Sequence, residues 1–280
     1  MLKAIDYINY YVTMEGKEGF EKFHEQEGVV CKLSAVYSGG VPYTPPETMI
    51  AQMDEAGVER VFLTRLLMFS YIHKRPFETC TTRELVEVVD KYPKRFCGYA
   101  TYNPFRISDS LKELEMLVKE HNFKGAFVHI FGFDIPLDDK KMYPLYAKCA
   151  ELDVPVVMQV GYVLEGMPSE HGRPMLLDRI ALDFPRLKIV GSHTGYPWCE
   201  ELIAVSYKFD NVYFGVSAHF PKYLDPSVIR FINTRGQNKV IFGTNSIPFK
   251  PMLQQIEELG LKEEAKNKLL YENAARLFKL

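Results

Sequence analysis

Eight short runs of apolar, β-branched or aromatic residues recur along this chain of 280 residues and constrain its fold more than any other feature. Amphipathic stretches separate them. Runs that are apolar at consecutive positions are typical of parallel strands buried on both faces. The predicted strands span residues 2–8, 58–64, 96–101, 126–130, 154–160, 187–192, 212–216 and 240–243.

Eight strands that alternate with helices predict an α/β protein with a (β/α)8 TIM barrel, formed as a single domain by residues 1–280. A doubly wound open sheet is the alternative, but its usual glycine-rich first turn does not occur in the sequence. Helices are predicted to begin at Pro46, at a capping box from Ser110 to Glu113, and near Pro197. Residues 10–45 are expected to form an elaborated loop, and 262–279 a closing helix.

Charge and cysteine content narrow the class of protein. The 34 basic and 36 acidic residues give a net charge of −2, which predicts binding to neither nucleic acid nor a membrane surface. No apolar run approaches the roughly 18 residues that span a bilayer, and Asp6 interrupts the N-terminal apolar stretch where a signal peptide would be continuous. Five scattered cysteines without a CxxC pair favour reduced thiols and a cytoplasmic location.

Polar residues at the ends of the predicted strands are the candidates for a functional site. In a parallel barrel the C-terminal ends of all strands meet at one mouth, so these residues become neighbours. They are Asn9, Arg65, Tyr102, His129, Gln159, His193, His219 and Asn245, and His171 lies in a loop that could close over the mouth. Histidine suits acid–base chemistry near neutral pH. Every barrel also needs polar groups where strand ends meet water, so each residue has a purely structural alternative.

Several segments resemble the amidohydrolase-related family, which includes aminocarboxymuconate-semialdehyde decarboxylase. The resemblance lies in FKGAFVHI, LDRIALDFPRLKIVGSHTGYPW, VIFGTNSIPF and LLYENAARLF, in that order along more than half of the chain. It implies a TIM-barrel hydrolase or carboxy-lyase that acts on a small carboxylated cyclic or unsaturated substrate. Self-association into a homo-oligomer is common in the family.

The family's divalent metal site is where the sequence departs from this resemblance. The family takes two ligands from an HxH motif after the first strand, where this chain has Ile8 and Tyr10. Gln159 and Asn245 stand at a histidine and an aspartate position, and only His193 matches. Isoleucine offers no donor atom and amides are weak ligands for zinc-type ions. We therefore expect no metal cofactor, with a relocated site on His129, His193 and His219 as the alternative.

These observations favour a metal-independent enzyme in which His193 carries the main acid–base role, assisted by His129 or His219. Gln159 and Asn245 are then expected to polarise the substrate, with Arg65, Asn9, Tyr102 and His171 as further substrate-binding candidates. The expected partner is a small-molecule substrate. A pseudoenzyme that binds a ligand on the same barrel without turnover is the alternative from a different class.

Overall fold

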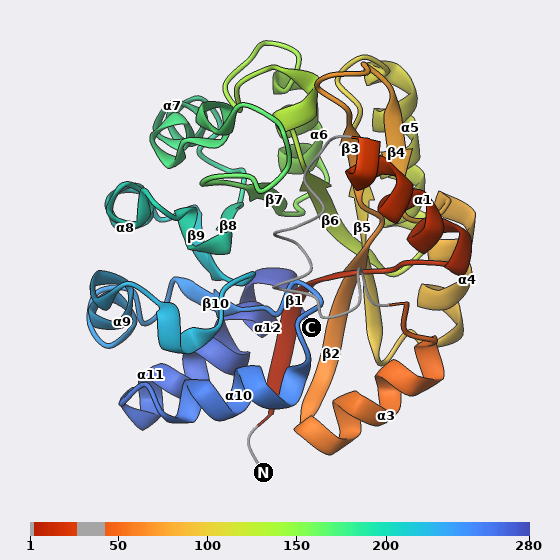
Figure 1. The fold of residues 1–280 in the computed structure, drawn as a ribbon. Coiled ribbons are helices and arrows are strands. Elements are labelled where there is room, and N and C mark those ends of the chain that lie inside the picture. Colours follow the sequence, from red (N-terminus) through yellow and green to blue (C-terminus); the bar gives the residue numbers. More distant parts are fainter. Residues whose placement is uncertain (1–2, 27–42) are drawn as a thin grey trace.

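Eight parallel strands form one sheet in the computed structural model, which describes residues 3–26 and 43–280 (Figure 1). Neighbouring strands follow the order of the chain, which is the arrangement of a TIM barrel, so the predicted fold is confirmed and the open sheet is wrong. The strands are β1 (Ala4–Tyr10), β2 (Val58–Thr64), β5 (Phe96–Thr101), β6 (Phe123–Val128), β7 (Val156–Gln159), β8 (Ile189–Ser192), β9 (Val212–Val216) and β10 (Val240–Phe242).

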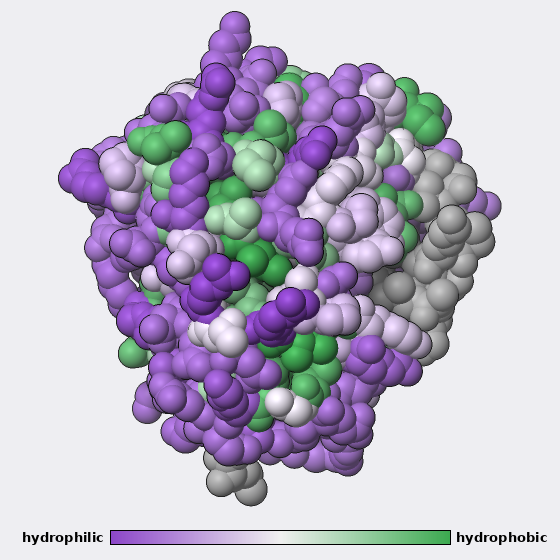
Figure 2. Space-filling model, turned by 90° about the vertical axis from the view of Figure 1, so that its left-hand side faces the viewer, coloured by the Kyte–Doolittle hydropathy of each residue, from purple (hydrophilic) through white to green (hydrophobic). Residues whose placement is uncertain are grey.

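Helices cover the outside of the barrel, and a small hairpin of β3 (Leu67–Phe69) and β4 (Pro76–Glu78) follows β2. The helices are α1 (Met14–Gln26), α3 (Pro46–Ala56), α4 (Thr82–Lys91), α5 (Ile107–Glu120), α6 (Tyr143–Glu151), α7 (Leu177–Asp183), α8 (Cys199–Lys208), α9 (Pro226–Ile232), α10 (Phe249–Glu257), α11 (Glu263–Asn267) and α12 (Asn273–Phe278). Figure 2 shows the face over α7, α8 and α9, which is mostly hydrophilic with apolar patches in its hollows. None of the helices described here has the length and apolar character needed to cross a bilayer.

The buried carboxylate of Asp6 links the first strand to the segment after the last strand through hydrogen bonds. Asp6 Oδ1 accepts hydrogen bonds from the backbone nitrogens of Thr244 (2.8 Å) and Ile8 (3.1 Å). Its Oδ2 accepts from the Thr244 hydroxyl (2.5 Å) and from Asn9 Nδ2 (3.1 Å). Burial raises the pKa of Asp6 to about 6, although these hydrogen bonds act to lower it. These four hydrogen bonds hold Asp6 at the junction between β1 and the segment after β10.

The interior of the barrel is filled by large aromatic side chains. Tyr7 is fully buried and lies so close to Gly215 and Gly243 that a Cβ atom on either glycine would approach its ring or hydroxyl within 2.7 Å. Tyr99 donates a hydrogen bond to the Tyr7 carbonyl (2.8 Å). This packing leaves the C-terminal ends of the strands as the place where a cavity can open.

Three of the predicted helix features differ from the structure. The helix α5 begins three residues before Ser110, whose hydroxyl instead accepts a hydrogen bond from the backbone nitrogen of Asn103 (3.2 Å). Pro197 follows a cis peptide bond and precedes α8 rather than opening it. The C-terminal helix contains a π-helical turn at Lys268–Glu272. The predicted loop 10–45 contains α1, and its residues 27–42 lie outside the described part of the chain.

Candidate active site

A cavity of about 150 Å³ opens at the C-terminal ends of the strands and brings together five of the nine candidate residues. His129 follows β6, Gln159 ends β7 and His193 follows β8. His219 and Asn245 lie just after β9 and β10. Further lining comes from Tyr10, Phe20, Leu66, Thr79, Tyr162, Leu164, Glu165, Tyr196, Ala218 and Ser246.

His193 is held in place by a short polar chain that runs into the barrel. Its Nδ1 lies 2.8 Å and its backbone nitrogen 3.2 Å from the Ser217 hydroxyl, which in turn lies 2.6 Å from the Tyr7 hydroxyl. Burial lowers the pKa of His193 to about 3, and the nearby His219 and His129 add to this effect. His193 is therefore a neutral imidazole with a fixed orientation at neutral pH.

The backbone at His193 adopts a conformation that non-glycine residues seldom take. The φ angles of His193, Thr194 and Gly195 are 57°, 59° and 68°. Left-handed backbone costs on the order of 1–3 kcal/mol at each of the two non-glycine residues, and such residues cluster at functional sites. The turn places the imidazole directly over the end of β8.

A carboxylate beside His129 gives this histidine a different electrostatic environment. Burial lowers the pKa of His129, and the carboxylate of Glu165 opposes that effect. Burial raises the pKa of Glu165, but His24 and His129 hold it below its ordinary value. His24 Nε2 lies 3.6 Å from Glu165 Oε1, and both side chains are almost fully buried. A carboxylate thus acts on the pKa of His129, whereas the charges that act on His193 are those of other histidines.

Aromatic rings form the rim next to His219. The Tyr196 ring lies 5.5 Å from the His219 ring and 5.6 Å from that of Tyr162, between centroids. Burial lowers the pKa of His219, so it too favours the neutral form. Tyr162 and Tyr196 are partly exposed, which places them where the cavity meets solvent.

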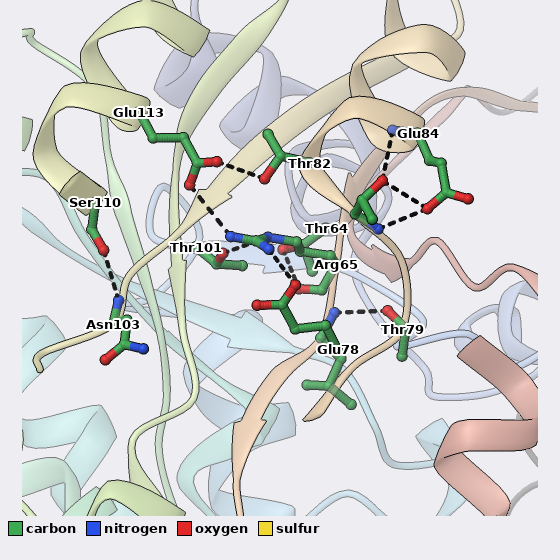
Figure 3. A network of polar contacts seen from close by, with 12 residues as sticks. Thr64, Arg65, Glu78, Thr79, Thr82, Glu84, Thr101, Asn103, Ser110 and Glu113 are labelled. Carbon is green, nitrogen blue, oxygen red and sulfur yellow. Dashed lines mark hydrogen bonds and ion pairs between the residues drawn. The ribbon is translucent and has the colours of Figure 1, made fainter. Parts of the chain in front are cut away.

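Arg65 is directed away from the cavity by a polar network that Figure 3 shows. Its guanidinium donates to Thr101 (2.8 Å), Glu78 (2.5 Å) and Glu113 (3.3 Å). Glu113 also accepts a hydrogen bond from Thr82 (2.6 Å). Two carboxylates thus already neutralise Arg65, and it is not among the described lining residues of the cavity.

Three other candidates also lie outside the described lining. Tyr102 is buried and donates to the Lys141 carbonyl (2.6 Å). His171 Nε2 lies 2.9 Å from an oxygen of Asp134. Asn9 is one layer below the cavity, where it bonds Asp6 and accepts from the Ser246 hydroxyl (2.7 Å). Asn9 can therefore position a lining residue, whereas Tyr102 and His171 are occupied elsewhere.

The side chains present do not fit the divalent ion that the resemblance implies. In the described ranges, no group of three or more histidine, cysteine, aspartate or glutamate side chains converges to hold a metal. His129, His193 and His219 line the same cavity without forming such a group. Asp6, the acidic residue closest to the expected position, is already fully hydrogen-bonded.

Sequence reasoning missed Glu165 and two residues of α1, His24 and Phe20, that build this side of the cavity. Glu165 lies six residues beyond the end of β7, and α1 belongs to the insertion after β1. The convergence of strand ends in a parallel barrel singles out only residues that lie at or just after the end of a strand. An isolated acid in an apolar loop was the one signal available for Glu165.

A barrel with polar groups gathered at its C-terminal mouth defines the TIM-barrel class of catalytic scaffold. Within that class, the sequence profile of the family described as Amidohydrolase matches residues 65–280. The chain therefore belongs to the amidohydrolase family, and the resemblance found in the sequence is confirmed. This membership makes it a member of an enzyme family.

Two relatives are similar to this chain in sequence. A gamma-resorcylate decarboxylase from Polaromonas sp. is 25% identical, with 81% of this chain and 85% of the relative covered. A 2-keto-4-carboxy-3-hexenedioate hydratase from Sphingobium sp. is 29% identical, but the match covers 44% of this chain and only 43% of the hydratase.

The solved structures extend over the whole chain. An uncharacterised TIM-barrel protein from Bordetella bronchiseptica has a TM-score of 0.77 at 24% identity, with 99% of each chain covered. A dihydroxybenzoic acid decarboxylase from Polaromonas sp., solved with manganese and the inhibitor 2-nitroresorcinol, has a TM-score of 0.73 at 20% identity, covering 100% of this chain and 98% of that one. At these identities the likeness establishes the fold.

Proposed function

We propose that this protein is a carboxy-lyase of the amidohydrolase family that removes CO2 from a small hydroxylated aromatic carboxylate by acid–base catalysis without a metal. The observation that carries the proposal is a cavity lined by His129, Glu165 and the neutral, oriented His193. The long match to a decarboxylase supports the reaction class. A carboxy-lyase of this kind needs a proton donor, an oriented polar group and a dry pocket.

The two histidines take different parts because their environments differ. Decarboxylation places a proton on the carbon that bears the carboxylate, and the electron pair of the broken C–C bond returns to the ring as CO2 leaves. His129 supplies that proton; burial lowers its pKa, and the carboxylate of Glu165, which lines the same cavity, opposes this effect. His193, neutral and fixed by Ser217, accepts a hydrogen bond from a substrate hydroxyl. His219 completes the polar side of the cavity.

The amides and aromatic rings supply binding and desolvation. Gln159 and Asn245 can donate to substrate oxygens without competing for the proton. The described lining contains no lysine or arginine, so no lysine or arginine cation meets the substrate carboxylate there, and Tyr10 and Phe20 supply apolar surface. Loss of water from a carboxylate favours its conversion to neutral CO2.

The test is turnover of chelator-treated, metal-analysed protein with 2,6-dihydroxybenzoate and a panel of other hydroxybenzoates, followed by CO2 release. We expect turnover without added metal, and a loss of at least about 100-fold in His129→Gln or His193→Gln. His121→Gln, on the surface beside Asp90, is the matched control that keeps full activity.

Three results would contradict the proposal. Activity that appears only after Mn²⁺ is restored would return the reaction to a metal. Hydration of an unsaturated carboxylate without CO2 release would make the protein a hydratase. Ligand-induced thermal stabilisation with no turnover would identify the pseudoenzyme.

A further inference from the structure

Two tyrosines form an aromatic rim where the cavity meets solvent. Tyr162 lies in the segment after β7 and Tyr196 in the segment after β8, and both line the cavity. Tyr162 is 38% exposed and Tyr196 is 50% exposed. Aromatic rings in a ligand pocket supply apolar surface that a bound molecule can cover. The rim therefore offers such a surface at the entrance to the histidines.

Backbone contacts fix the two loops that carry these rings. The Tyr162 backbone nitrogen donates a hydrogen bond to the Tyr196 carbonyl oxygen (2.8 Å), and the Gly161 nitrogen donates to the Gly172 carbonyl oxygen (2.8 Å). The loops also pack closely, because a Cβ atom on Gly161 would lie only 2.5 Å from the Tyr196 carbonyl oxygen. Groups that are already in place cost less entropy on binding than groups that a ligand must order. The two loops thus hold the rim in position before a ligand enters.

The geometry of the rings leaves Tyr196 unstacked by its two aromatic neighbours. The planes of Tyr162 and Tyr196 meet at 69°, with centroids 5.6 Å apart. The planes of Tyr196 and His219 meet at 57°, with centroids 5.5 Å apart. Neither neighbour lies parallel to the Tyr196 ring. Tyr196 therefore joins the histidine side of the cavity to solvent and can take a planar ring against its own.

The other aromatic rings of the described lining are packed more deeply into the protein. Phe20 is 6% exposed, and its ring lies 5.7 Å from that of Phe77 between centroids. The Tyr10 ring meets that of Phe127 edge-on at 6.0 Å. Tyr196 is the most exposed aromatic residue of this lining. It is therefore the ring with the most surface left for a ligand to cover.

We propose that Tyr196 is a specificity-determining residue whose ring packs against the planar ring of the substrate, so that the site selects aromatic over saturated cyclic carboxylates. The inference rests on the proposed function for placing the substrate carboxylate at the histidine end of the cavity. A ring attached to that carboxylate then extends toward the mouth, where Tyr196 lies. A flat aromatic ring can stack on Tyr196 or meet it edge-on, whereas a puckered saturated ring has no π surface to do so.

The test is isothermal titration calorimetry of the full-length protein with benzoate and cyclohexanecarboxylate. Both ligands carry one carboxylate on a six-membered carbon ring, so the ratio of their dissociation constants isolates the contribution of the aromatic ring. In Tyr196→Leu we expect this ratio to shift by about 5-fold against benzoate. Tyr196→Phe keeps the ring and should keep the wild-type ratio. Tyr223→Leu, at a tyrosine that is 71% exposed and outside the described lining, is the matched control and should also keep it.

Three results would overturn the proposal. A shift in Tyr196→Phe as large as that in Tyr196→Leu would assign the selection to the hydroxyl rather than the ring. Equal weakening of both ligands in Tyr196→Leu would show that only apolar area is lost. A wild-type protein that binds neither ligand would show that the cavity does not take ring carboxylates.

Binding and turnover separate this proposal from the proposed function. A shifted ratio in a protein that decarboxylates nothing would refute the proposed function and leave Tyr196 as a specificity residue of a binding site. Turnover of hydroxybenzoates together with an unchanged ratio in Tyr196→Leu would do the reverse. Where turnover is found, Tyr196→Leu should raise KM more than it lowers kcat, because the ring contact is present in both the ground state and the transition state. A fall in kcat at constant KM would contradict this role.

Discussion

Replacing Ser217 with alanine tests the polar chain that orients His193. The Ser217 hydroxyl contacts three buried groups: the Tyr7 hydroxyl (2.6 Å), His193 Nδ1 (2.8 Å) and the backbone nitrogen of His193 (3.2 Å). Alanine lacks this oxygen, so each of the three groups loses its hydrogen bond to residue 217. Each buried polar group that loses its partner costs about 1–3 kcal/mol.

The size of the effect depends on how many buried groups lose a hydrogen-bond partner. The backbone nitrogen and Nδ1 of His193 have no other hydrogen bond to a described side chain, whereas the Tyr7 hydroxyl also interacts with Ser192 and with the backbone of His193. We therefore expect Ser217→Ala to lower the free energy of unfolding by about 2–4 kcal/mol. Tyr7→Phe removes only the phenol oxygen, and its ring keeps its place against Gly215 and Gly243, so about 1 kcal/mol is expected.

Urea unfolding of both single variants and the double variant at pH 7.5 measures these values. In the Tyr7→Phe background, Ser217→Ala no longer removes a hydrogen bond from the phenol oxygen. The loss of unfolding free energy in the double variant should therefore be about 1 kcal/mol smaller than the sum of the losses in the two single variants. A Ser217→Ala cost below about 0.5 kcal/mol, or strict additivity, would refute the argument that the chain is a coupled network.

Three further predictions concern stability. Gly161 has a φ of 91° and a Cβ there would lie 2.5 Å from the Tyr196 carbonyl oxygen, so Gly161→Ala should cost about 2 kcal/mol in urea unfolding, and an unchanged midpoint would contradict this. Arg65→Met leaves Glu78 and Glu113 without their cation, so stability should fall by about 2 kcal/mol while ligand affinity, measured by calorimetry, stays the same. His193 takes up a proton near pH 3 in the folded state, where its pKa is about 3, and near pH 6.5 in the unfolded state. The free energy of unfolding of the wild type should therefore fall as the pH drops from about 6.5 to 3, and this fall should be smaller in His193→Gln. Equal slopes in the two proteins would argue against a buried neutral histidine.

Strand positions followed from hydrophobic runs because every strand of the barrel is buried on both faces. The bounds of β2, β5 and β9 agree with the predicted ranges. β1 is shifted, starting at Ala4 and continuing to Tyr10, since Asn9 and Tyr10 still pair with β2. Asn9 reads as a polar strand end in the sequence, yet its side chain meets a buried acceptor, Asp6, that only the closed barrel provides.

The site was predicted in part because strand ends converge whatever the loops do. That rule placed His129, Gln159, His193, His219 and Asn245 in one cavity, where the structure has them. It carries no information on side-chain direction beyond the strand, so it could not foresee that Arg65 turns toward α5. The convergence of strand ends also says nothing about insertions between strands, and α1, which contributes Phe20 to the cavity, lies in such an insertion.

The location of charge in the cavity differs from the metal-dependent pattern that the sequence resembles. That pattern places its ligands near β1 and β10, where this chain has Ile8, Tyr10 and Asn245. The acid at this edge, Asp6, is turned to the barrel seam by four hydrogen bonds. The carboxylate among the described lining residues is Glu165, in the loop after β7, where it contacts His24. On the proposed function, this carboxylate supports proton transfer in a cavity where a metal-dependent site would hold a cation.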